Sequence, residues 1–136
     1  MIQYQKILNL NLINVFKDIL RNIKENGISN KNQLYITFLT DHKNVKIPNW
    51  LIKKYPKEIT IIIQFEFYDL KIYEDFFKIV LSFDDIKTDL KIGYDSIISF
   101  ADPIANFGLR FQTDNLQNNQ KEQKNNVINF LNYKKN

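Results

Sequence analysis

A long stretch of β-type sequence, residues 58–83, constrains the fold of this chain more than any other segment. β-Branched and aromatic residues recur at every second position through most of it, which is typical of strands with one buried face. Apolar side chains take odd positions in residues 61–67 and even positions in residues 70–72, so a turn or bulge is expected near Tyr68 and Asp69. The rest of the chain must cover this sheet, extend it or hang from it.

Length and composition indicate one domain that can bury its own core. The chain has 136 residues, 44% of them hydrophobic, which suffices for a core without metals or disulfides. It contains no cysteine, which excludes disulfides, thiol catalysis and cysteine-ligated zinc and fits a reducing compartment. No apolar run approaches the roughly 20 residues of a membrane span, and no secretory signal is evident. We therefore expect a cytoplasmic protein with no membrane partner.

The charge is mildly basic and mixed. With 19 basic and 15 acidic residues, the net charge is +4. Such a balance is more typical of a solvated mixed-charge surface than of a track for phosphates. We therefore do not expect a nucleic-acid partner.

Residues 4–26 have apolar side chains at the three-and-four spacing of an amphipathic helix, and Gly27 is expected to end it. Ile7, Leu10 and Ile13 widen the apolar surface beyond one stripe. These extra residues either rest on the body of the same protein or bind a partner. We predict a homodimer formed chiefly by this helix, with an interface of Leu12, Val15, Phe16, Ile19 and Leu20.

Shorter elements follow the helix. Residues 34–38 are expected to form a strand, and residues 48–56, with a proline at each end, a helical turn that covers the sheet edge. The last strand is expected at residues 107–111.

The alternating runs 77–83 and 86–92 are separated only by Asp84 and Asp85, which predicts a hairpin with a two-residue turn. The favoured geometry of such a turn needs positive φ at both positions. Aspartate adopts this conformation less readily than glycine.

No motif in the sequence indicates catalysis. A phosphate-binding loop, a metal-ligand cluster and a nucleophile motif are all missing, and the one histidine, His42, follows Asp41 in an expected loop, where a surface role is usual. We predict that the protein is not an enzyme and has no catalytic residues, no metal site and no cofactor.

The C-terminal part changes composition twice. Residues 112–126 consist almost entirely of polar and charged residues and are expected to form a disordered linker. Residues 127–136 become apolar again and look like a tethered docking peptide. The expected organisation is thus a domain over residues 1–111, a linker over 112–126 and a peptide over 127–136.

Several fragments at matching intervals together resemble the SspB family in its alphaproteobacterial form, over roughly residues 4–111 and the end of the tail. The fragments that carry the resemblance are Leu34-Tyr35-Ile36-Thr37-Phe38, Ile47-Pro48-Asn49-Trp50-Leu51, Tyr55-Pro56, Leu81-Ser82-Phe83, Phe100-Ala101-Asp102-Pro103 and Phe107-Gly108-Leu109-Arg110-Phe111.

The resemblance implies a bacterial adaptor that serves protein quality control. Family members capture polypeptides that bear the ssrA tag, which is added during ribosome rescue, and deliver them to the ClpXP protease. The implied fold is mainly β: a small Sm-like β-sandwich or partly open barrel, preceded by one long N-terminal helix through which the family dimerises and followed by a disordered tail.

The resemblance also implies two binding segments. A tag-peptide groove would lie between the strand that ends in the hairpin and the last strand, and its residues would be Leu81, Ser82, Phe83, Ile86, Leu109, Arg110 and Phe111. The C-terminal peptide would dock on the N-terminal domain of ClpX through Val127, Ile128, Phe130, Leu131, Lys134 and Lys135.

The chain departs from the family pattern at the hairpin, where Asp84 and Asp85 replace the usual pair of glycines. The alternative function is that of a small Sm-like β-barrel that binds RNA, because aromatic strands on a basic protein can stack bases. A continuous positive surface would favour RNA, and an apolar groove with one arginine would favour the tag.

Overall fold

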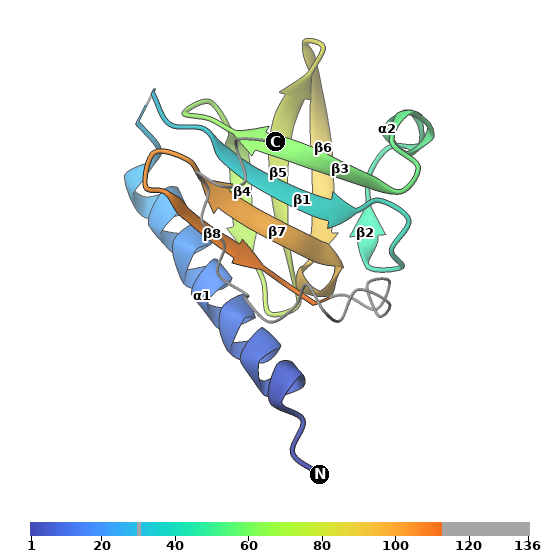
Figure 1. Cartoon of the computed structure of the whole chain (residues 1–136). Helices are drawn as coiled ribbons and strands as arrows, with labels where there is room; N and C mark the ends of the chain where they lie inside the picture. Colours follow the sequence, from blue (N-terminus) through green and yellow to red (C-terminus); the bar gives the residue numbers. More distant parts are fainter. Residues whose placement is uncertain (30, 113–136) are drawn as a thin grey trace.

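Two four-stranded antiparallel sheets face each other in this computed structural model, which describes residues 1–29 and 31–112 (Figure 1). Sheet A has the strand order β3-β1-β7-β8, with β1 Leu34–Leu39, β3 Glu58–Ile63, β7 Ile97–Asp102 and β8 Phe107–Arg110. Sheet B has the order β2-β6-β5-β4, with β2 Val45–Lys46, β4 Tyr68–Ile72, β5 Phe76–Phe83 and β6 Ile86–Gly93. The expected mainly β sandwich is confirmed, and the described strands form no closed barrel.

The predicted N-terminal helix is also confirmed. Helix α1, Tyr4–Asn26, ends at Gly27, whose φ of 73° is a conformation that favours glycine. The Gly27 N–H donates to the Ile23 carbonyl oxygen at 2.8 Å, which satisfies one of the last carbonyls of the helix. In Figure 1 the helix runs along one side of the sandwich, and its first turns project beyond the sheets.

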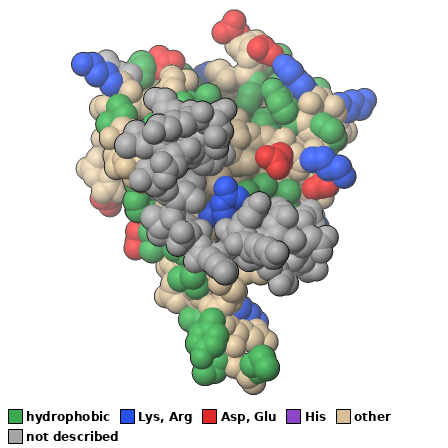
Figure 2. Space-filling model, viewed as in Figure 1, with side chains coloured by type: hydrophobic (Ala, Val, Ile, Leu, Met, Phe, Trp, Pro, Cys, Tyr) green, Lys and Arg blue, Asp and Glu red, His purple; other side chains and the backbone are tan. Residues whose placement is uncertain are grey.

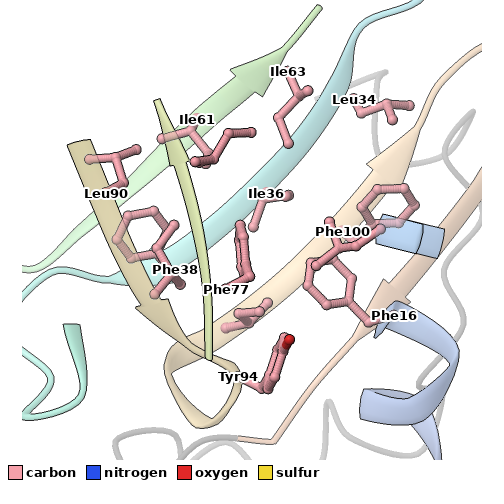
Figure 3. Close-up of a cluster of buried hydrophobic side chains, with 14 of the residues drawn as sticks. Phe16, Leu34, Ile36, Phe38, Ile61, Ile63, Phe77, Leu90, Tyr94 and Phe100 are labelled. Carbon is pink, nitrogen blue, oxygen red and sulfur yellow. The ribbon is translucent and has the colours of Figure 1, made fainter. Parts of the chain in front are cut away.

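Phe16 joins the helix to both sheets. Its side chain has no exposed surface, and it lies edge-on to Phe77 of β5 and to Phe100 of β7, with ring centroids 5.8 Å away in each case (Figure 3). Phe111 and Tyr94 complete the ring of neighbours at 5.9 Å and 6.3 Å. Edge-to-face aromatic pairs of this kind stabilise a core beyond their buried area. The hydrophobic core is therefore shared by three layers.

A bulge accounts for the change from odd to even apolar positions within residues 58–83. Asp69 has a φ of 51°, and the pairing of β4 with β5 shifts register between Tyr68 and Lys71. This confirms the irregularity expected at Tyr68 and Asp69. The strand before it is shorter than its alternation indicates, because β3 ends at Ile63 and Phe65 is 53% exposed.

Tyr94 follows β6 in a short 3-10 helix, Tyr94–Ser96, and is almost completely buried. Its hydroxyl donates a hydrogen bond to the Tyr73 carbonyl oxygen at 2.8 Å. Burial raises the pKa of Tyr94 to about 12; Arg21 opposes this rise, and Glu74 and Asp75 add to it.

The raised pKa of Tyr94 predicts a loss of stability at alkaline pH. The neutral phenol stabilises the fold fully below its ordinary pKa of about 10, and the contribution is lost as the pH rises towards the folded pKa of about 12. Urea unfolding from pH 8 to pH 12 should show the stability difference between wild type and Tyr94→Phe fall by on the order of 2 kcal/mol. Parallel stability curves for the two proteins would contradict this prediction.

Candidate functional site

The hairpin β5–β6 ends in the predicted two-residue turn. Asp84 and Asp85 have φ values of 51° and 65°, which confirms that both residues adopt positive φ. Phe83 and Ile86 are the last pair of the ladder. Turns of this kind twist in the same sense as the strands that they join, so the two strands stay paired to the tip.

Burial along the inner face of the hairpin stops before the tip. Leu81 and Thr88 are paired and only 4% and 2% exposed. Two pairs further on, on the same face, Phe83 is partly buried, whereas Ile86 is 55% exposed. Figure 1 shows the reason: the hairpin rises beyond strand β3, so its tip has no strand of sheet A opposite it.

Helix α2, Asn49–Lys54, supplies an aromatic side chain to this overhang. Pro48 precedes the helix, and Leu51, which is 1% exposed, anchors it in the core. Trp50, one residue earlier, is 39% exposed, and its ring lies edge-on to Phe83 with centroids 6.5 Å apart. We call Trp50, Phe83 and Ile86 the hairpin patch.

Charged side chains border the hairpin patch. Lys54 Nζ of α2 lies 3.5 Å from the Asp84 carboxylate of the turn, and the two side chains are 55% and 77% exposed. An ion pair so exposed contributes little to stability. In Figure 2, acidic groups stand at the top of the molecule, where the hairpin ends, and hydrophobic side chains are exposed below them. This arrangement can bind the apolar side chains of a peptide.

The two predicted walls of the tag groove belong to different sheets, β5 to sheet B and β8 to sheet A. The hairpin tip contacts α2, next to the β3 edge of sheet A. Strand β8 is the last strand at the other edge, beyond β1 and β7, and two residues after its end the Gln112 N–H donates to Asn9 Oδ1 of α1 at 3.0 Å. Strands β1 and β7 lie between β3 and β8 in sheet A, and the placement of the tag groove between β5 and β8 stays a prediction.

The predicted groove residues also differ in exposure. Leu81, Leu109 and Phe111 belong to the core, at 4%, 2% and 2% exposed. Ser82 is exposed on the outer face of sheet B, and Arg110 is half-buried in sheet A, opposite Ser99 of β7. Among the predicted residues, only Phe83 and Ile86 lie in the hairpin patch.

The residues predicted for the dimer interface also differ in exposure. Leu12, Phe16 and Leu20 are 8%, 0% and 0% exposed because they face the protomer's own core, so they are not available to a second copy. Ile19 is partly buried against the same core, whereas Val15 is 41% exposed.

The exposed apolar residues of α1 lie mostly in its first turns. We call these residues the helix-end surface: Tyr4, Ile7, Leu8 and Leu10 are 72%, 54%, 40% and 56% exposed. Figure 2 shows hydrophobic side chains on this projecting end of the molecule. An apolar surface of this kind on a soluble protein commonly marks an interaction site.

His42 has a structural place in a loop, not the surface position expected for it. Its side chain is 7% exposed, its Nδ1 accepts a hydrogen bond from the Asn44 N–H at 3.0 Å, and its Nε2 lies 4.0 Å from Asp95. Among residues 1–29 and 31–112, no group of three or more metal-ligating side chains gathers. In the same residues no helix is long and apolar enough to span a membrane.

The predicted linker, apart from Gln112, and the predicted docking residues lie outside the described residues. They are Val127, Ile128, Phe130, Leu131, Lys134 and Lys135.

Trp50 lies in the hairpin patch but is not among the residues that the sequence predicted for the tag groove. Its signal was present in the sequence, because a tryptophan in a helical turn bounded by Pro48 and Pro56 has few ways to bury its whole ring.

Comparison with known proteins gives one family. The family model described as SspB, stringent starvation protein B, matches residues 9–131, which is most of the chain. No curated protein matches the sequence.

Proposed function

The chain belongs to the SspB family, whose members are adaptors and not enzymes, and from this premise we propose that it captures ssrA-tagged polypeptides and delivers them to the ClpXP protease. The hairpin patch is the observation that supports peptide capture. The patch combines exposed apolar surface from two elements, helix α2 with Trp50 and the hairpin with Phe83 and Ile86. Exposed aromatic and aliphatic side chains next to one another are typical anchors for a bound peptide.

Strand β3 adds a second means of holding an extended peptide. It is the outer strand of sheet A and pairs only with β1 among the described strands. The hairpin patch lies at the same edge of the sandwich. A tag that runs along this edge would place apolar side chains on the patch and backbone groups near β3.

Delivery would use the C-terminal peptide. Its apolar residues Val127, Ile128, Phe130 and Leu131 would bind the N-terminal domain of ClpX, and Lys134 and Lys135 would steer the encounter. The polar segment 112–126 would act as a tether that raises the local concentration of captured substrate at the protease.

A homodimer would double this effect, and we place its interface on the helix-end surface. Ile7 and Leu10 are more than half exposed in the first turns of α1, and this end of the helix projects beyond the sheets. Two copies packed through these turns would bury apolar area at about 25 cal/mol per Å².

The first prediction tests capture with a fluorescent ssrA-tag peptide. Trp50→Ala and Ile86→Ala should each weaken binding at least tenfold, because both remove an anchor, while the melting temperature changes little. Ile104→Ala is the matched control, since Ile104 is 64% exposed in the turn after β7, away from the patch. If Arg110→Glu weakens binding and the two patch variants do not, the groove lies at β8 and our placement fails.

The second prediction concerns delivery. Removal of residues 127–136 should leave tag affinity unchanged but abolish the acceleration of tagged-reporter degradation by ClpXP, because capture and docking use different segments. Serine at the four apolar positions Val127, Ile128, Phe130 and Leu131 should act like the deletion. A truncated protein that still accelerates degradation as well as the full chain would rule out tethering through the tail.

The third prediction concerns the dimer. Sedimentation equilibrium should show that Leu10→Glu is a folded monomer at tens of micromolar, while wild type is a dimer, because the substitution places a charge in the interface. Lys24→Glu, a charge change on an exposed residue in the last turn of α1, is the control and should remain dimeric. Phe16→Glu should instead unfold the protein, since Phe16 is fully buried. A wild-type monomer at this concentration would refute the interface.

A further inference from the structure

Four lysines form a row across the outer face of sheet B. Lys46 of β2 is paired with Lys91 of β6, Lys91 with Lys78 of β5, and Lys78 with Lys71 of β4. The row therefore crosses all four strands at one level. Since neighbouring strands lie about 4.8 Å apart, its backbone positions span roughly 14 Å.

The row is costly to the folded protein. Like charges directly opposite one another on neighbouring strands destabilise a sheet. Lys46, Lys71 and Lys78 are exposed and Lys91 is half-buried. None of these amines forms an ion pair with a carboxylate in the described part of the chain. An arrangement of cations without carboxylate partners suits an external polyanion.

The face is also hollowed at this row. A pocket of about 420 Å³ is lined by the four lysines, by two carboxylates, Asp69 and Asp89, and by apolar residues that include Val80. Four positive and two negative side chains leave an excess of two positive charges. The mixed character of the whole sequence therefore does not apply to this face.

Aromatic rings flank the row on both sides. Tyr68, which is 41% exposed, has Lys87 Nζ 4.2 Å from its ring centroid. On the other side Tyr73, which is 42% exposed, stacks on Phe76 with centroids 4.6 Å apart, and Lys91 Nζ lies 4.4 Å from the Phe76 ring. Cations and aromatic rings that alternate on one surface are what single-stranded nucleic acids require for phosphates and bases.

We propose that the outer face of sheet B binds single-stranded nucleic acid without sequence preference, as a second function separate from peptide capture. The lysine row holds successive phosphates, and Tyr68 and Tyr73 offer ring surface to bases on either side. An acidic peptide would use the lysines but gain nothing from the two tyrosines. A duplex fits less well, because the lysines in the middle of the row lie in a hollow of the sheet and cannot enter a groove of the double helix.

The test is fluorescence anisotropy of a labelled 20-nucleotide oligouridine with the full-length protein between 50 and 200 mM salt. With three to four phosphate contacts, the slope of log affinity against log salt should be about −2 to −3. Lys71→Gln with Lys78→Gln should weaken binding at least tenfold and reduce the slope by about 1.4, because each contact contributes about 0.7. The melting temperature should not fall, since the change removes repulsion.

The control is Lys31→Gln with Lys57→Gln, which makes the same change in net charge on exposed residues that precede strands β1 and β3 of sheet A. Its affinity and slope should equal those of wild type. The proposal is overturned if the control loses as much affinity as the row variant, or if the oligouridine does not bind at 50 mM salt. It is also overturned if a decaglutamate peptide or a duplex of equal length competes as well as unlabelled oligouridine. Because Lys71 and Lys78 lie outside the hairpin patch, tag binding by the row variant should be unchanged, so the outcome does not depend on the adaptor function.

Discussion

The insertion of Phe16 between the two sheets is the interaction on which the rest of the structure depends. Its ring contacts aromatic side chains of β5 and β7 and those of Tyr94 and Phe111, so one side chain ties the helix to both layers. Loss of a buried phenylalanine typically costs about 3–5 kcal/mol, a large share of the stability of a small domain. The helix is therefore part of the fold, and its first turns carry most of the exposed apolar side chains that could serve a partner.

The sequence predicted what local periodicity and turn chemistry determine. The helix up to Gly27, the bulge near Asp69 and the two-residue turn at Asp84 and Asp85 all depend on residues close together in the chain, and the structure has each of them. Which face of the helix is buried was harder to predict, because its apolar residues cover more than one face. Only the packing of Phe16 decides that Leu12 faces inward while Leu10 faces solvent.

What the sequence could not give was the arrangement of strands from distant parts of the chain. The expected groove joins the end of β5 in sheet B to β8 in sheet A, and no local pattern in the sequence shows that the order β3-β1-β7-β8 leaves β8 at the edge away from β3. The lysine row was invisible for the same reason, since Lys46 and Lys91 become neighbours only through the pairing of β2 with β6. The charge balance of the whole sequence does not reveal such a local row of like charges.

One hairpin carries both proposed surfaces, and its register keeps them apart. In β5, Phe83 points to the inner face and the hairpin patch, whereas Lys78 points to the outer face and the row. Because side chains alternate along a strand, a slip of one residue would exchange the faces, exposing core residues such as Leu81 and burying lysines. The tight turn fixes this register even though aspartate adopts positive φ at some cost, at both Asp84 and Asp85. The short turn is nevertheless favoured, because a longer loop would fix the pairing of β5 with β6 less firmly. The core and both surfaces depend on that pairing.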